Sequence, residues 1–552
     1  MIKRFFNSQT KTVTFAAGLL SISALLSKAL GLIRDGLLAG HFGASIETDI
    51  YFAAFRIPDF VYNFLIVGGL TIAFLPLFSD YYLKDKEKSW EMVSNLLNVF
   101  LFFLVIISFV LFLFTPYLMR IVAPGFSEES LKLAALLTRL MFLSPILFGI
   151  SNIFSGILHY FNRFLSYSLA PVLYNLGIIF GILFFVPYFG IIGLGLGVIL
   201  GAFLHLIIQL PAAFLCGFKY RISFNLKHPA LLQIFKLMIP RSFAIGAQQI
   251  NLVIITAIAS TLSAGSIAIF NFSNNLYHLP IGIFGISFAV ACFPELSRTW
   301  ALGKSEEFFK KLSSSFRQVL FLVIPASVLI FLLRAQLVRV VLGSLGPGRF
   351  NWQDTRLTAA SLGIFSFSIL ASALIPLICR VFFSLKDTKT PTLVTGVGVL
   401  VNVFLSLFFT KALIHSGIIY KVLSSFFDLS NIENIAVVGL PLAFSLAAIL
   451  QLFFLLLFLY FKVGNFRVFE IFNSFLKITI ASLFLGLATY FGLYLLSDFV
   501  NMKTFSGVLL QGFLAGSLGI LVYLLLSLVF RISELRIIRN AVVGQFKKDE
   551  CI

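Results

Sequence analysis

Long apolar stretches dominate the chain, and this feature limits its possible folds more than any other. A helical span needs roughly 20 apolar residues, and about 14 stretches qualify. They lie at approximately 12–41, 48–79, 92–115, 131–160, 167–187, 190–217, 232–262, 267–297, 309–333, 356–385, 391–413, 436–461, 472–496 and 506–530. We therefore predict an all-α integral membrane protein with about 14 transmembrane helices.

The few charged residues of the chain are mostly basic. Of 552 residues 59% are hydrophobic and 11% charged, with 41 Lys and Arg against 22 Asp and Glu. The basic residues form short groups between apolar stretches, not the patch or reader motif of a nucleic-acid-binding protein. They are about three times as frequent in the connections on one side, which predicts that both termini are cytoplasmic. One outer loop, Arg334 to Arg356, is more basic than this rule favours.

Motifs for metal, redox or nucleotide chemistry are missing from the sequence. The four cysteines are scattered, the six histidines have no metal-binding spacing, and no Gly-rich loop of the Walker type occurs. We therefore expect no metal, no cofactor and no catalytic residues. Any transport would be driven by an ion gradient, the membrane potential or the substrate gradient.

One internal repeat is visible. The segment 73–79 at the end of the second span is similar to 291–297 at the end of the eighth. An even number of spans separates them, which indicates parallel repeats. We predict two pseudo-symmetric lobes around a central cavity, formed by residues 1–220 and 221–462, followed by two further spans and a cytoplasmic tail in 463–552.

Polar residues inside the spans gather in the two helix pairs that the repeat relates. The second span carries Asp49, Arg56, Asp59 and Asn63 on one face, and in the first span Lys28 and Asp35 share a face. Arg34 should point a quarter-turn away unless Gly31 breaks that helix. The seventh and eighth spans repeat the pattern with Arg241, Gln248 and Asn251, and with Asn271, Asn274, Asn275 and His278.

These stripes favour a hydrophilic cavity over simple packing, because ionisable groups within a bilayer usually face water or a partner. Lys28, Arg34, Arg56 and Arg241 would attract an anion, and guanidinium groups suit phosphate. Asp35, Asp49 and Asp59 would hold these cations in the empty cavity or bind a coupling cation. The isolated Asn152, Asn175, Asn402 and Gln451 are better interpreted as packing contacts between helices. The last two spans carry almost no buried charge and could offer an apolar groove to a lipid tail.

The chain resembles a known family in several motifs that occur in the same order. They are Leu26 to Asp35 (LSKALGLIRD), His41 to Ala44 (HFGA), Thr48-Asp49, Ala54 to Pro58 (AFRIP), Ala123 to Phe126 (APGF), Asn162 to Phe164 with Ala170-Pro171, and Lys386 to Pro391 (KDTKTP). This set is similar to the MurJ/MviN lipid II flippases of the multidrug/oligosaccharidyl-lipid/polysaccharide exporter superfamily. The resemblance implies a 14-helix fold with a cationic cavity in a bacterial cytoplasmic membrane.

Individual positions agree with the family pattern to different degrees. Arg34 and Asp49 match it, whereas Lys28 stands where the family usually has Arg. Asn63, and likewise Asn275 and His278, stand where the family has charged residues, so two cavity arginines are missing. We hypothesise that Arg56 and Arg241 replace their charge.

The resemblance implies a flippase, not an enzyme, that moves lipid II from the inner to the outer leaflet by alternating access. Its expected partners are this undecaprenyl-pyrophosphate-linked glycan, membrane lipid and the cell-wall synthesis machinery, and not nucleic acid. The alternatives are an exporter of another polyprenyl-linked oligosaccharide or of drugs. A membrane-embedded glycosyltransferase would need acidic or His groups near an interfacial loop, and a structural scaffold would leave the stripes unexplained.

Overall fold

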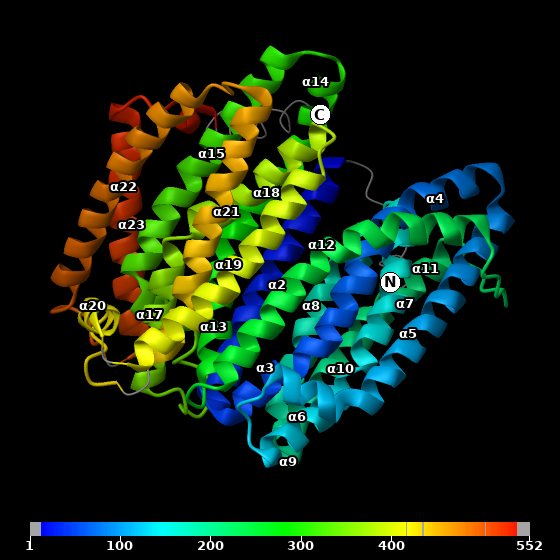
Figure 1. Ribbon diagram of the computed structural model, residues 1–552, viewed down its shortest axis with the longest axis horizontal. Coiled ribbons are helices and arrows are strands. Elements are labelled where there is room, and N and C mark those ends of the chain that lie inside the picture. Colours follow the sequence, from blue (N-terminus) through cyan, green and yellow to red (C-terminus); the bar gives the residue numbers. More distant parts are fainter. Residues whose placement is uncertain (1–12, 416, 433–434, 503, 538–552) are drawn as a thin grey trace. The chain divides into compact units, whose positions relative to one another are not determined.

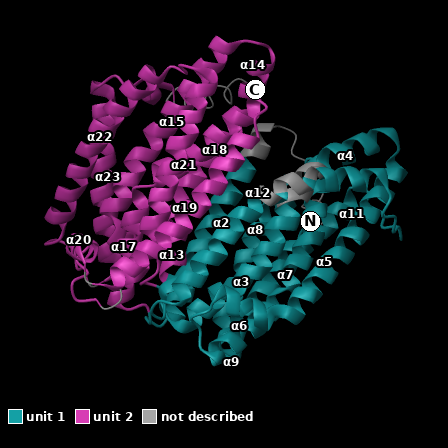
Figure 2. Ribbon diagram, in the orientation of Figure 1, with its two compact units in different colours: residues 1–268, 345–349 teal, residues 269–344, 350–552 magenta. Residues whose placement is uncertain are grey.

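The computed structural model describes residues 13–415, 417–432, 435–502 and 504–537, without the side chains of 13–17, 68–73, 237, 239–241 and 243–244. Every regular element in these ranges is helical (Figure 1). The chain divides into two compact units, residues 1–268 with 345–349 and residues 269–344 with 350–552 (Figure 2). The division falls inside one helix, α13, and the lobe boundaries expected from the sequence stay a prediction.

The first unit is built from consecutive helices. Its elements are α2 (Val13–Phe42), α3 (Ile46–Val61), the π-helical segment η1 (Tyr62–Leu70), α4 (Thr71–Lys84), α5 (Lys86–Val122), α6 (Glu128–Met141), α7 (Leu143–Tyr160), α8 (Phe164–Phe180), η2 (Gly181–Phe185), α9 (Val186–Phe189), α10 (Ile192–Ile207), α11 (Leu210–Leu215) and α12 (Pro229–Ser260). The helix α2 runs through Gly31 without a break.

The second unit begins within α13 and contains the remaining helices. They are α13 (Ser266–Pro280), η3 (Ile281–Ile286), α14 (Ser287–Ala301), α15 (Ser305–Leu332), α16 (Arg334–Val341), α17 (Trp352–Ser366), α18 (Ile369–Ser384), α19 (Lys389–Ile414), α20 (Ile418–Phe426), the 3-10 turn η4 (Ile435–Val438), α21 (Gly439–Val463), α22 (Val468–Leu496) and α23 (Phe505–Val529).

The described residues confirm an all-helical membrane protein. They include 11 helical segments that are long and apolar enough to cross a membrane, or 12 if the bent pair α17 and α18 is one span. The stretches predicted at 12–41 and 232–262 form α2 and α12 but are not among these 12. The helix α2 carries Lys28, Arg34 and Asp35, and the apolar part of α12 is short, Ile245–Ser260. The number 14 therefore stays a prediction.

The two copies of the internal repeat share an unusual local architecture. In the first, α3 leads through π-helical η1 into α4, with Pro58 near the end of α3 and Pro76 in α4. In the second, α13 leads through η3 into α14, with Pro280 at the end of α13 and Pro294 in α14. The similar segments 73–79 and 291–297 lie in α4 and α14.

Glycines allow close contacts between neighbouring helices in the first unit. A Cβ atom on Gly177 of α8 would lie 2.4 Å from the Cα atom of Gly201 on α10. One turn further along the chain, a Cβ atom on Gly181, the first residue of η2, would lie 2.4 Å from the Cα atom of Gly197. Small residues bring helix backbones together in lipid, where no hydrophobic effect drives helices into contact.

Polar contacts connect the last two spans to α15 and α16. The hydroxyl of Tyr523 donates to the carbonyl of Phe321 over 2.7 Å. The carboxylate of Glu534, only 1% exposed, lies 2.8 Å from the guanidinium of Arg317. Near the other end of α22 and α23, the Gln336 amide donates to Gln511. The last two spans are therefore an integral part of the second unit.

Candidate functional site

Arg34 on α2 lies at the centre of a polar cluster in the first unit. Its Nε and Nη2 atoms donate to the same oxygen of Asp35, over 3.0 and 2.8 Å. Its Nη1 atom donates to the amide oxygen of Asn175 on α8, over 3.2 Å. The Arg34 side chain is 24% exposed and the Asp35 side chain 5% exposed. A buried carboxylate and an amide from a second helix thus fix the direction of a partly accessible guanidinium.

Asn175 connects α2 and α8 through more than this one bond. Its amide nitrogen contacts the hydroxyl and the carbonyl of Ser27, as well as the carbonyl of Pro171. Asn175, which the sequence predicts to be a packing contact, also orients Arg34. The only signal in the sequence was a lone amide within an apolar stretch, which does not distinguish the two roles.

Arg56 on α3 extends the polar region toward α12. Its Nε atom donates to the hydroxyl of Thr256 over 2.7 Å, and that hydroxyl donates to the carbonyl of Leu252. Arg56 also lines a cavity of about 410 Å³ whose other walls are apolar side chains of α3, η1, α5 and α12. Asp59, half-buried one turn further along α3, is close enough to Arg56 and Arg34 to interact with both electrostatically.

Lys28 and Asn63 are the remaining candidates of the first unit. Lys28 is half-buried on α2, and it has no ion pair within the described ranges. The amide nitrogen of Asn63 donates to the carbonyl of Asp59 over 2.9 Å, so it is occupied by its own helix. Of the sequence-predicted residues, the structure thus brings Arg34, Asp35, Arg56 and Asp59 into one electrostatic group.

Asp49 has a different environment from the other candidates. Its side chain is buried, and its Oδ1 and Oδ2 atoms accept backbone N–H groups of Ala268 and Gly265, each over 2.7 Å. A carboxylate at this position satisfies the first N–H groups of α13 and interacts favourably with the positive end of the helix dipole. The geometry therefore gives Asp49 the role of a helix cap.

The candidates of the seventh and eighth spans are only partly described. Arg241 lies on α12, and its side chain is outside the described residues. On α13, Asn271 is buried, Asn275 is half-buried and His278 is exposed, all within the second unit. The neighbouring Tyr277 is buried and its hydroxyl bonds to Ser372 on α18.

Comparison with known proteins assigns the family. The model of the family described as lipid II flippase MurJ matches residues 38–426, which is more than half of the chain. The chain belongs to the MurJ lipid II flippase family. This confirms the resemblance found in the sequence motifs and makes the protein a transporter, not an enzyme.

Individual members of this family match most of the chain. The probable lipid II flippase MurJ of Buchnera aphidicola subsp. Acyrthosiphon pisum is 30% identical over 403 residues, covering 72% of this chain and 78% of that protein. The lipid II flippase MurJ of Burkholderia cenocepacia is 27% identical over 416 residues, covering 73% and 80%.

Solved structures agree with this assignment. A MurJ lipid II flippase in an inward closed conformation superposes with a TM-score of 0.74 at 26% identity, covering 93% of this chain and 99% of that one. An inward-facing multidrug transporter of the MATE family superposes with a TM-score of 0.61 at 15% identity, covering 82% and 99%. The second match shows the shared fold alone.

Proposed function

We propose that this member of the MurJ family moves lipid II from the inner to the outer leaflet of the cytoplasmic membrane by alternating access. The observation that supports the role of its site is the fixed guanidinium of Arg34. The ion pair with Asp35 and the bond from Asn175 hold this group in place before any substrate arrives. Such preorganisation lowers the entropy that binding costs.

The donors of Arg34 suit a pyrophosphate. A guanidinium has five N–H groups. Three of them are used on Asp35 and Asn175, which leaves one N–H on each of the two terminal nitrogens. Two parallel donors at the end of a guanidinium match two oxygens of a phosphate group. Arg34 is therefore our candidate for the pyrophosphate anchor.

The neighbouring charges complete the proposed site. Lys28 and Arg56 add positive charge, and Asp35 and Asp59 balance it when no anion is bound. Asn63, Asn275 and His278, together with Arg241, are proposed to contact the sugar and peptide parts of the headgroup or the pyrophosphate. Asp49 contributes by holding the start of α13.

The proposal also covers the orientation of the chain in the membrane and its partner proteins. Both termini lie in the cytoplasm, because the basic connections between the spans concentrate on that side. Contact with the cell-wall synthesis machinery would allow the flipped precursor to be used directly. An exporter of another polyprenyl-linked oligosaccharide stays the alternative, since such a lipid carries the same pyrophosphate.

Complementation of a flippase-depleted bacterial strain tests the proposal. We expect Arg34→Ala to abolish growth at normal expression, and Arg34→Lys to restore it only partly because the two parallel donors are lost. Arg120→Ala is the matched control, because Arg120 is exposed and pairs with Glu128. Growth of the Arg34→Ala strain at the wild-type rate would show that Arg34 is not the pyrophosphate anchor.

A second measurement addresses the substrate. After depletion of the protein, lipid II accessible on the outer leaflet should fall while lipid II on the inner leaflet accumulates. An unchanged outer-leaflet pool, together with the accumulation of a different polyprenyl-linked glycan inside, would favour the alternative.

A further inference from the structure

Arg334 is one of several arginines near the connection between α15 and α17 that form no ion pair with a carboxylate among the described residues. In this stretch, which the sequence places on the outer side, Arg356 pairs with Asp428 over 3.3 Å. Arg339 lies over the ring of Trp352, 5.6 Å from its centre. In the part of the chain that the structure describes, no carboxylate lies within 4 Å of Arg334.

Arg334 is held in an aromatic setting at the start of α16. Its guanidinium carbon lies 4.9 Å from the ring centre of Phe331 and 5.4 Å from that of Phe427. Its Nη1 atom donates to the carbonyl of Phe331 over 2.7 Å. A Cβ atom on Gly363 would lie 2.9 Å from the Cδ atom of Arg334, so the glycine leaves room for the arginine stem. This is a positioned cation, not a freely moving one.

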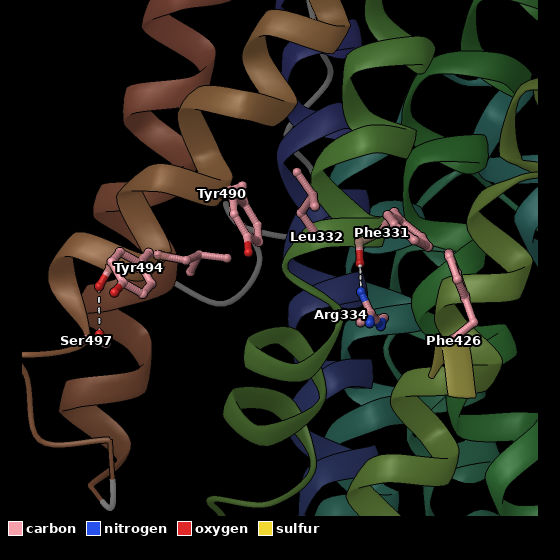
Figure 3. A pocket seen from close by; sticks show the side chains of 8 residues that line it. Phe331, Leu332, Arg334, Phe426, Tyr490, Tyr494 and Ser497 are labelled. Carbon is pink, nitrogen blue, oxygen red and sulfur yellow. Dashed lines mark hydrogen bonds between the residues drawn. The ribbon is translucent and has the colours of Figure 1, made fainter. Parts of the chain in front are cut away.

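Arg334 lines a pocket of about 510 Å³ between α15, α16, α20 and α22. Its polar lining consists of Arg334, Ser497 and the two tyrosines Tyr490 and Tyr494 (Figure 3). The other lining residues are apolar, and none of the lining residues is a carboxylate. A cation with several hydroxyl donors favours an anion with several oxygen acceptors.

An apolar groove of about 710 Å³ continues directly from this pocket. The two share Phe331, Leu332 and Tyr490. Along α22 the groove extends from Tyr490 back to Phe475, which is about 22 Å at the helical rise of 1.5 Å per residue. Half of a hydrocarbon core measures about 15 Å, so the groove is long enough to follow a lipid chain through one leaflet.

We infer that this pocket and groove together bind a resident phospholipid of the outer leaflet. Its phosphate oxygens accept hydrogen bonds from Arg334 and from the hydroxyls of Tyr490 or Tyr494. One acyl chain lies in the groove between α15, α18 and α22. Tyrosine is enriched at the membrane interface, where its ring contacts hydrocarbon and its hydroxyl contacts the headgroup.

Charge and shape together select this ligand. A soluble phosphate would leave the apolar groove unfilled, and a neutral lipid would offer Arg334 no anionic acceptor. The outer-leaflet assignment uses the orientation proposed above, but the binding itself does not depend on transport. The site lies within the second unit, whereas the Arg34 cluster lies in the first.

The test measures the lipid that the purified protein retains, without lipid II. The full chain is reconstituted in nanodiscs of equal parts phosphatidylglycerol and phosphatidylcholine, extracted into mild detergent and examined by native mass spectrometry. We expect one tightly retained phospholipid on the wild type. Arg334→Gln should lower its retention about tenfold, which is the usual effect of losing a hydrogen bond to a charged group.

Two further variants make the result specific. Leu487→Trp fills the groove but keeps Arg334, and it should also reduce retention. Arg339→Gln removes a neighbouring basic residue that does not line the pocket, and it should change nothing. Wild-type retention in both Arg334→Gln and Leu487→Trp would overturn the inference. So would complete displacement of the phospholipid by an equimolar polyprenyl phosphate, because the site would then belong to the transported lipid.

Discussion

The guanidinium of Arg34 donates to the amide oxygen of Asn175, 3.2 Å away on a helix that lies 141 residues further along the chain. This bond joins α2 to α8 and directs the proposed anchor of the pyrophosphate. The uncharged Asn175 therefore contributes to the proposed function of Arg34 by orienting its guanidinium.

Asn175→Ala should weaken transport more than it weakens the fold. The loss of one hydrogen bond to a charged group frees Arg34 to rotate, and we expect about a tenfold drop in lipid II flipping by reconstituted protein. The cost in unfolding free energy should stay near 1–2 kcal/mol. Gln451→Ala is the control, because the Gln451 amide joins two helices of the second unit by donating to the hydroxyl of Thr395. Equal flipping rates for the two variants would contradict the positioning role.

Replacement of Asp49 should destabilise the protein by removing a buried helix cap. Asp49→Ala leaves the N–H groups of Gly265 and Ala268 without their acceptor, at a cost of about 1–3 kcal/mol. Asp49→Asn keeps one acceptor oxygen and should cost less. Thermal unfolding in detergent measures the effect of both changes. Asp85→Ala, which removes the more exposed N-cap of α5, is the comparison. A larger loss for Asp85→Ala than for Asp49→Ala would argue against this account.

Asp387 between α18 and α19 should make stability depend on pH in the acid range. Burial alone would raise the pKa of its carboxyl, but the Lys462 ammonium and two bonds from Thr390 outweigh it and hold the pKa at about 2. The unfolded value is 3.8, so the ionised group adds stability that is complete above about pH 4 and is lost as pH falls toward 2.

Comparison of the wild type with Asp387→Asn checks this effect. The difference in unfolding temperature should be constant between pH 7 and 5 and should shrink below about pH 4. A difference that grows as the pH falls would have the wrong sign.

The glycine contacts between α8 and α10 predict that Gly→Ala changes at different positions have different effects on the free energy of unfolding. Gly177→Ala places a methyl group against the α10 backbone and should cost about 1–3 kcal/mol. Gly396→Ala on α19 meets nothing within 4 Å and should be neutral or stabilising by up to about 1 kcal/mol, because alanine favours the helix. Denaturation of both variants under the same conditions distinguishes packing from helix propensity.

Much of the fold was predictable, because the bilayer imposes a simple rule. An apolar stretch such as 472–496 becomes one long helix, α22, since its backbone has no other way to satisfy its hydrogen bonds in lipid. The similar segments 73–79 and 291–297 lie in α4 and α14, which each follow a π-helical segment. Charged helices were harder to predict. Because α2 carries Lys28, Arg34 and Asp35, its hydropathy alone does not identify it as a membrane span.

The site was less predictable than the fold, because its contacts join distant parts of the chain. Helical spacing placed Arg56 and Asp59 on one face, and the structure brings them together with Arg34. The same spacing put Asp49 in the stripe, although its partners are backbone groups 216 and 219 residues away. Thr256, which receives the bond from Arg56, has no distinguishing pattern in the sequence.

The π-helical segments η1 and η3 have a mechanical consequence. A wider helical turn keeps its backbone hydrogen bonds while it changes the spacing of its residues, so it offers a joint that bends without exposing bare peptide groups to lipid. Each segment follows a proline, Pro58 or Pro280, that already removes one bond from the preceding helix. Each unit thus carries its own hinge in the span that holds its polar stripe, and bending there would re-aim that stripe while the ends of the span keep their partners.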